Sequence, residues 1–113
     1  MKKVLMSLVV LTLFSYSCRN SNGAVVEKSV KVWGNCGKCE KRIEDASKIK
    51  GVSDADWNVD SKLLTFKVDT TITSVNEILK NVAKAGHDNE LYFADDYAYS
   101  NLPESCQYER RTE

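Results

Sequence analysis

The sequence has no excess of charge of either sign. Its 16 lysine and arginine residues balance 16 aspartate and glutamate residues, so the formal net charge is zero at pH 7. No basic run is dense enough to indicate binding to nucleic acid. Histidine and proline each occur once, as His87 and Pro103. No serine–histidine–aspartate set and no pair of carboxylates has a convincing catalytic spacing, so we predict that the protein is not an enzyme.

Long apolar runs are also scarce. The run at residues 4–14 is shorter than the roughly 20 residues that a membrane-spanning helix needs. It follows two lysines and precedes small residues and Cys18, an order typical of an export signal. We therefore expect residues 1–17 to be a signal peptide, and their ending resembles a bacterial lipoprotein signal. The resemblance implies an exported protein on the periplasmic side of the cell envelope, anchored through a lipid on Cys18. A soluble periplasmic product and an uncleaved anchor are the alternatives.

Residues 26–94 show the hydropathy pattern of one small domain. Alternating apolar residues predict strands at residues 26–33, 52–59 and 64–68, and a short fourth strand at residues 89–93. Apolar residues at helical spacing predict one helix that ends before Gly51 and another that ends before Gly86. The order is βαββαβ. We therefore predict a ferredoxin-like α+β sandwich, in which two helices cover one face of a four-stranded antiparallel sheet.

Two segments flank this domain. Residues 18–25 form a short polar stretch that we interpret as a tether. Residues 95–113 form a C-terminal extension without a hydropathy period, although three tyrosines indicate that it packs on the domain. We expect it to cover the open face of the sheet or an edge of the domain. A role for Cys106 in binding a metal or a partner is the alternative.

Cys36 and Cys39 are separated by two residues at the junction between the first strand and the first helix. The N-terminus of a helix favours an anion, and lysines and an arginine nearby add positive charge, so the sequence predicts reactive thiols. Thiolates prefer soft ions such as Cu(I). Structural Zn(II) sites normally have four protein ligands, whereas this motif supplies two. Two thiolates therefore suit Cu(I) or Hg(II) best, and Zn(II) less well.

The stretch from Val32 to Cys39, with Ile43, Gly51-Val52 and Gly86-His87, resembles a heavy-metal-associated domain. The resemblance covers about residues 26–93 and implies that Cys36 and Cys39 are the metal ligands. It also implies a carrier or scavenger of Cu(I), with Hg(II) or Zn(II) as alternatives, and a metal-transporting ATPase or an efflux protein as partner. The loop is one residue shorter than the family's usual motif and lacks its methionine.

Several alternatives stay open at this point. A CxxC pair also serves thiol–disulfide exchange, but those proteins have a larger fold and a cis-proline loop, and here Pro103 lies in the extension. A sensor of metal or redox state is another candidate. His87 is a candidate third ligand, because neutral imidazole binds copper and zinc, or a polar residue beside the loop. Cys106 is a candidate cap for the site, a partner for an outside thiol, or a packed cysteine.

Overall fold

The computed structural model describes residues 24–112. The expected signal peptide, Cys18 and most of the tether lie outside these residues. Within the described part of the chain, no helix has the length and apolar character needed to cross a membrane.

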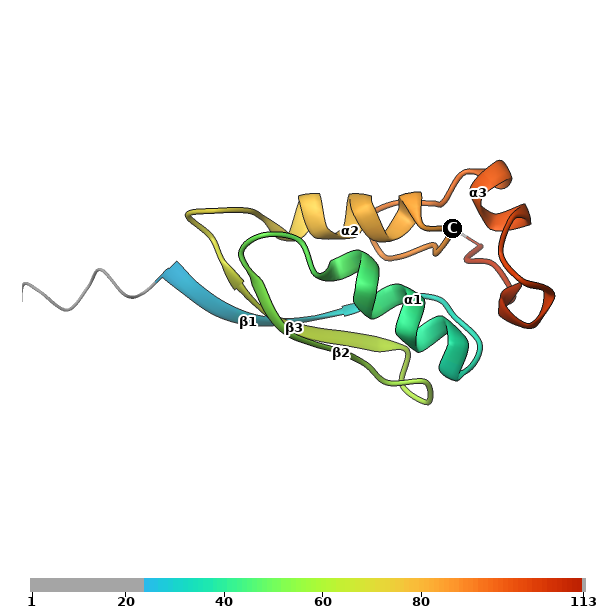
Figure 1. The fold of residues 1–113 in the computed structure, drawn as a ribbon, viewed down its shortest axis with the longest axis horizontal. Coiled ribbons are helices and arrows are strands. Elements are labelled where there is room, and N and C mark those ends of the chain that lie inside the picture. The colour runs from blue at the N-terminus through green and yellow to red at the C-terminus, as the bar shows by residue number, and fades with distance from the viewer. Residues whose placement is uncertain (1–23, 113) are drawn as a thin grey trace, which may run out of the picture.

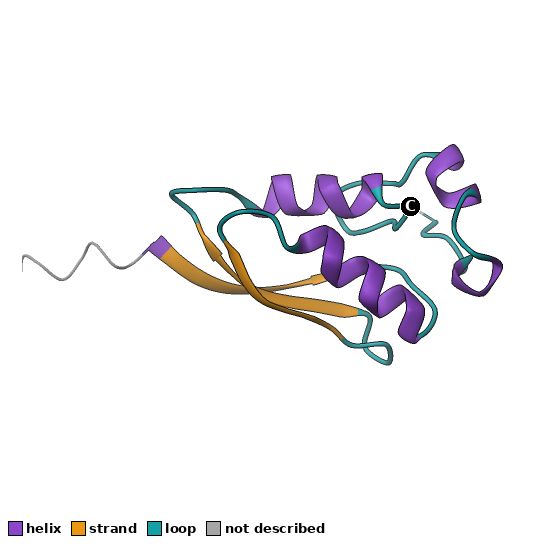
Figure 2. Ribbon diagram, in the orientation of Figure 1, coloured by secondary structure: helices purple, strands orange, loops and turns teal. Residues whose placement is uncertain are grey.

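An antiparallel sheet with two helices on one face forms the body of the molecule (Figures 1 and 2). Its elements are β1 (Val25–Lys31), α1 (Gly37–Ser47), β2 (Val52–Trp57), β3 (Leu63–Asp69) and α2 (Val75–Lys84). β3 lies in the centre and pairs with both neighbours, in the order β1-β3-β2. A short helix, α3 (Asp96–Ser100), and a 3-10 turn, η2 (Glu104–Cys106), follow in the extension. The predicted α+β class and the arrangement of helices on one face are confirmed.

The described sheet has three strands, and the fourth strand predicted at residues 89–93 is replaced by a turn. Only an isolated bridge between Val32 and Asn89 remains where that strand was expected. The Asn89 Oδ1 atom accepts hydrogen bonds from the backbone N–H groups of Leu91 (3.1 Å) and Tyr92 (3.0 Å). Asparagine commonly bends the chain in this way, because its side chain satisfies backbone groups that a strand would pair with a neighbour.

A serine cap begins the second helix, and a glycine follows its end. Ser74 caps α2 by accepting a hydrogen bond from the backbone N–H of Glu77 at 3.2 Å. Gly86 follows the helix with φ of +109°, a conformation that favours glycine. A Cβ atom on Gly86 would also meet Leu102 at 3.0 Å. This turn therefore redirects the chain and brings the extension close to the end of α2.

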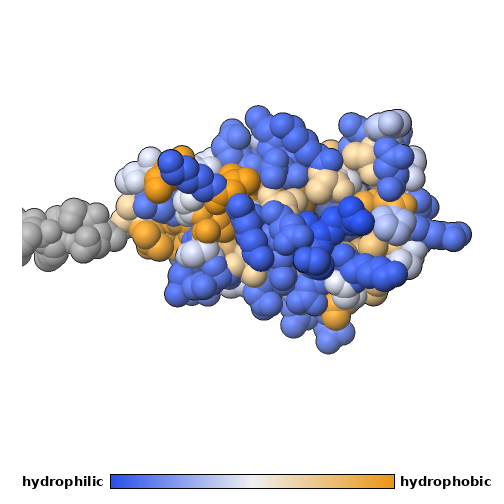
Figure 3. Space-filling model, viewed as in Figure 1, coloured by the Kyte–Doolittle hydropathy of each residue, from blue (hydrophilic) through white to orange (hydrophobic). Residues whose placement is uncertain are grey.

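The extension contributes side chains to the same buried core as the sheet and helices. It packs on the end of the molecule where α1 begins (Figure 1), and it leaves the open face of the sheet uncovered. The outer face that carries the two helices is mostly hydrophilic, and apolar side chains gather mainly where β1 begins (Figure 3). The core residues that are at most 5% exposed include Cys39, Leu64, Phe66, Ile78, Leu102, Cys106 and Tyr108.

Candidate metal centre

The two predicted ligands lie at the N-terminus of α1. Cys36 is the residue that precedes the helix, with extended backbone angles, and its carbonyl accepts hydrogen bonds from the N–H groups of Cys39 (2.9 Å) and Glu40 (3.1 Å). No side chain caps this helix end. The first turn of a helix has N–H groups without intrahelical partners, and these groups favour a negative charge. The structure therefore brings both cysteines to the helix end that favours an anion, although burial opposes the thiolate form at Cys39.

The two thiols differ in their exposure and in their acidity. Cys36 is half-buried, and a hydrogen bond from the backbone of Lys38 lowers its pKa below the ordinary value. Cys39 is fully buried, and burial raises its pKa despite hydrogen bonds from the backbone of Cys36 and Asn35. Only the Cys36 sulfur fits the prediction of a reactive thiol. A metal ion that enters the loop meets this sulfur first.

The extension covers both sulfurs with two consecutive backbone carbonyl groups. The Ser105 carbonyl oxygen lies 3.8 Å from the Cys36 Sγ atom, and the Cys106 carbonyl oxygen lies 3.8 Å from the Cys39 Sγ atom. Asn35 fixes this contact, because its Nδ2 atom donates to the Ser105 carbonyl at 3.1 Å. A hydrogen bond between the Cys39 and Cys106 side chains contributes to the raised pKa of Cys39. Cys106 therefore lies next to Cys39, one of the two predicted ligands.

The Trp57 side chain packs against the loop that precedes Cys36. Its indole N–H donates to the Val32 carbonyl at 3.0 Å, and its ring lies against Gly34. A Cβ atom on Gly34 would approach that ring to 2.8 Å and the Ile43 side chain to 3.1 Å. The close contact of glycine with tryptophan places the loop on the core in this shortened motif, which has no methionine to do so.

His87 is buried beside the loop and is held in one orientation. Its Nδ1 atom lies 2.8 Å from the Trp33 carbonyl oxygen, so Nδ1 carries the proton and donates it. Its ring stacks on Tyr108, with 5.1 Å between the ring centroids. Burial lowers its pKa, so the imidazole is neutral near pH 7. The buried Nε2 atom has no hydrogen-bond partner among residues 24–112.

Neither His87 nor Cys106 completes a tight three-ligand cluster with the thiol pair in this structure. Among residues 24–112, the one such set within 4.8 Å is formed by Glu40, Glu44 and Asp56, which the sequence did not single out. These carboxylates are at least partly exposed, and a hydrogen bond that protonated Glu40 donates to Glu44 raises the pKa of Glu40. Carboxylates suit hard ions, so this set is not a second soft-metal site.

An ion pair with a buried carboxylate holds the end of the extension on the domain. The Arg110 guanidinium donates to both carboxylate oxygens of Asp88, at 2.7 and 3.0 Å, and Asp88 is fully buried. Burial by itself raises the pKa of Asp88, but the hydrogen bonds from Arg110, Ala94 and Arg111 outweigh it and lower the pKa overall. The tyrosines of the extension indicated packing from the sequence, whereas this ion pair had no recognisable signal.

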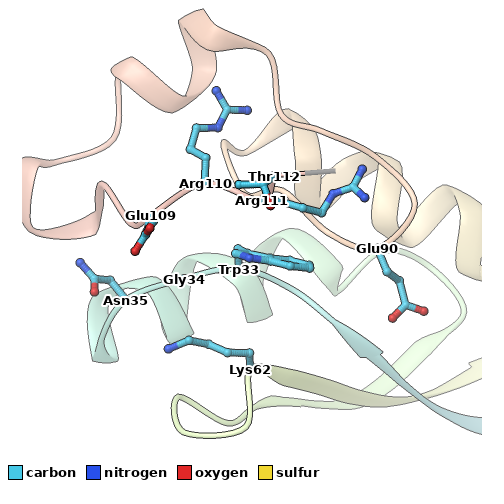
Figure 4. A pocket seen from close by; sticks show the side chains of 9 residues that line it. All are labelled: Trp33, Gly34, Asn35, Lys62, Glu90, Glu109, Arg110, Arg111 and Thr112. Carbon is cyan, nitrogen blue, oxygen red and sulfur yellow. The ribbon is translucent and has the colours of Figure 1, made fainter.

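A groove of about 670 Å³ lies on the other side of the loop (Figure 4). Trp33, Gly34 and Asn35 line it together with Lys62 and the end of the extension. The Arg111 guanidinium stacks on the Phe93 ring at 3.8 Å and lies 6.0 Å from the Trp33 ring. The groove carries both acidic and basic groups, so its charge selects no particular ligand.

An antiparallel sheet under two helices, with two thiols at the start of the first helix, defines a small α+β domain with a candidate soft-metal site. Residues 35–88 match the family model of the heavy-metal-associated domain. This segment of the chain is therefore similar to a heavy-metal-associated domain. No curated protein sequence matches the chain.

Two solved structures resemble it. One is a CopZ metallochaperone, with 26% identity and a TM-score of 0.54, and the match covers 57% of this chain and 98% of that one. The other is the solution structure of a candidate copper-ion-binding protein from Bacillus anthracis str. Ames, with 22% identity and a TM-score of 0.57. That match covers 59% of this chain and 97% of the other, and it supports the fold alone. Cys106 lies outside the residues that the family model matches.

Proposed function

We propose that this protein is an envelope carrier or scavenger that binds Cu(I) through Cys36 and Cys39. The observation that carries the proposal is the position of both sulfurs at the N-terminus of α1, within the segment that matches the heavy-metal-associated family. The similarity to a CopZ metallochaperone supports copper as the ion. Hg(II) is the first alternative, and Zn(II) is the second because it prefers four ligands.

The chemistry follows from the two thiol environments. Binding of Cu(I) displaces one proton from each thiol, so the bound ion and two thiolates carry one net negative charge. The backbone N–H groups at the start of α1 stabilise that charge. Cys36 is the more accessible and more acidic sulfur, so it captures the ion first and Cys39 completes the site. Release to a partner's thiol begins at the same half-buried sulfur.

Location and partner belong to the same proposal. The sequence pattern at residues 1–18 supports export and a lipid anchor at Cys18, on the periplasmic side of the envelope. A metal-transporting ATPase or an efflux protein is the proposed partner. Lys38, Lys41 and Arg42 line a groove of about 660 Å³ beside the thiol loop, which offers a basic surface for docking.

Thiol–disulfide exchange is the second candidate, and one observation favours it. An acidic, accessible cysteine followed after two residues by a buried one is the arrangement that a redox pair uses for attack and resolution. The fold argues against it, because the domain matches the heavy-metal-associated family.

An anaerobic titration with Cu(I), followed by mass spectrometry, tests the proposal. We expect about one ion per chain in the full-length protein and no tight binding after replacement of both Cys36 and Cys39 by serine. A Cys18→Ser variant is the matched control and should bind like the unsubstituted protein. Unchanged Cu(I) affinity in the double serine variant would refute the carrier. Insulin reduction without metal binding would establish the redox alternative instead.

A further inference from the structure

Cys106 is fully buried, although it belongs to an extension that the family match does not cover. Its carbonyl oxygen lies 3.8 Å from the Cys39 sulfur, and the preceding carbonyl, of Ser105, lies 3.8 Å from the Cys36 sulfur. These two consecutive residues of the extension therefore contact both sulfurs of the predicted pair. Cys39 and Cys106 are both free, buried thiols, and the Cys106 thiol contributes to the raised pKa of Cys39.

The extension is held in this position on both sides of Cys106. The η2 turn fixes the local backbone, because the Cys106 N–H donates to the Pro103 carbonyl at 2.7 Å. Leu102 before the turn and Tyr108 after it are buried in the core. The Tyr108 hydroxyl donates to the Gly86 carbonyl at 2.7 Å and accepts from the Asp88 N–H at 2.8 Å. A segment anchored at both ends presents the Cys106 sulfur at a defined place.

We propose that Cys106 supplies a third sulfur ligand, so that the extension closes over a soft ion as a three-thiolate centre. This inference rests on the proposed function, because it takes Cys36 and Cys39 as the first two ligands. Three thiols lose three protons to solvent when Cu(I) binds, and the ion and thiolates then carry two net negative charges. The start of α1 and the charge of Lys38, which acts on Cys36, stabilise that charge.

The three sulfurs do not all lie within 4.8 Å of one another in the described structure. Cys39 and Cys106 are both buried, whereas Cys36 is half-buried and precedes the helix. Rotation of the Cys36 side chain is therefore the movement that brings its sulfur to the other two. A partner thiol then reaches the ion only after the extension lifts, which favours retention of the ion over rapid relay.

X-ray absorption spectroscopy at the copper edge counts the sulfurs directly. Every sample is the full-length chain with Cys18→Ser, loaded with one equivalent of Cu(I) without oxygen, so that three cysteines are available. We expect three sulfurs around copper in this protein and two after Cys106→Ser. Chelator competition should show that Cys106→Ser weakens Cu(I) binding on the order of tenfold or more. Glu104→Gln, an exposed change in the same turn, is the control and should retain three sulfurs.

The outcomes separate this inference from the proposed function. One outcome is that copper has two sulfur neighbours in the protein with intact Cys36, Cys39 and Cys106, and that the Cys36→Ser, Cys39→Ser double variant loses binding. This outcome would overturn the third ligand and leave the proposed carrier function intact. Retained tight binding in that double variant would overturn both. If Cys106→Ser does not fold, as circular dichroism of the metal-free protein would reveal, the sulfur count of the protein with an intact Cys106 decides alone.

Discussion

Gly34 and Gly37 lie on either side of Asn35 and Cys36, but only Gly37 has room for a side chain. A Cβ atom on Gly34 would meet the Trp57 ring at 2.8 Å, whereas one on Gly37 would meet nothing within 4 Å. We therefore expect Gly34→Ala to lower the free energy of unfolding by about 1–3 kcal/mol, because the ring must shift in a packed core. Urea denaturation measures this change.

Gly37→Ala is the matched control for that prediction. Gly37 is the first residue of α1, and alanine favours the helix, so this variant should be neutral or more stable by up to about 1 kcal/mol. Equal losses of stability in the two variants would show that the contact between Gly34 and Trp57 does not hold the loop.

The two thiols should react with alkylating reagents at different rates. The pKa of Cys36 is lowered by the Lys38 backbone hydrogen bond, and the pKa of Cys39 is raised by burial. The thiolate is the reactive form, so at pH 7 iodoacetamide should modify Cys36 first. The rate of modification at each thiol should rise with pH until that thiol is fully ionised. The rate at Cys39 should therefore level off at a higher pH than the rate at Cys36. Peptide mapping by mass spectrometry reads both sites, and preferential modification of Cys39 would contradict the structure.

The pair itself was accessible to sequence reasoning, but its asymmetry was not. Two cysteines at a strand-to-helix junction, with basic neighbours, indicated a thiol site from local pattern alone. Cys39 is buried in the core, where its sulfur contacts the carbonyl of Cys106, which is 67 residues further along the chain. No periodicity links such distant segments. The sequence therefore predicted two reactive thiols where the structure has one accessible and one buried.

The same distinction holds for the secondary-structure elements. The three strands and both main helices were predicted near their observed places, because the apolar pattern that marks them is local. The expected fourth strand failed because the Asn89 side chain forms a turn with the N–H groups of Leu91 and Tyr92. Hydropathy does not register a competing hydrogen bond from a side chain. Of the two places expected for the extension, it occupies an edge of the domain, at the loop end, and not the open face of the sheet.

The extension is fastened to the domain by the pair of Asp88 and Arg110. Arg110→Met keeps the aliphatic stem but leaves the buried Asp88 carboxylate without its guanidinium partner. We expect a loss of about 2–4 kcal/mol in the free energy of unfolding at pH 7. Lys41→Met is the control, because the pair of Lys41 and Asp45 is exposed, and it should change stability by no more than about 0.5 kcal/mol. Similar effects of the two variants would contradict a structural role for Arg110.

The contribution of this pair should depend on pH. The pKa of Asp88 in the folded protein lies below its ordinary value of 3.8. The folded state therefore binds this proton less readily than the unfolded state, and the stabilisation is fully present above that value. It should disappear as the pH falls from about 3.8 through the lower folded pKa. The difference in unfolding free energy between the unsubstituted protein and Arg110→Met should accordingly shrink on acidification, and a constant difference would oppose this assignment.

For the molecule as a whole, the extension covers the two sulfurs of the proposed metal centre. The sheet and helices supply two sulfurs, and residues that the family model does not match cover them. Access to the ion then depends on how often the extension separates from the rest of the domain. Local opening of this kind has its own free energy, which is smaller than that of complete unfolding.

Tyr108 stabilises the closed position of the extension, so a substitution there should make opening more frequent. Its hydroxyl bridges the Gly86 carbonyl and the Asp88 N–H, so Tyr108→Phe leaves two buried backbone groups without a partner. Such a loss costs about 1–3 kcal/mol, which corresponds to roughly a 5- to 150-fold rise in the open population. We expect Cu(I) transfer to an excess of competing chelator to accelerate accordingly, as measured by stopped-flow absorbance. Tyr97→Phe is the control, because Tyr97 is 77% exposed and its transfer rate should match that of the unsubstituted protein. If both variants transfer copper at the unsubstituted rate, the extension does not gate the site.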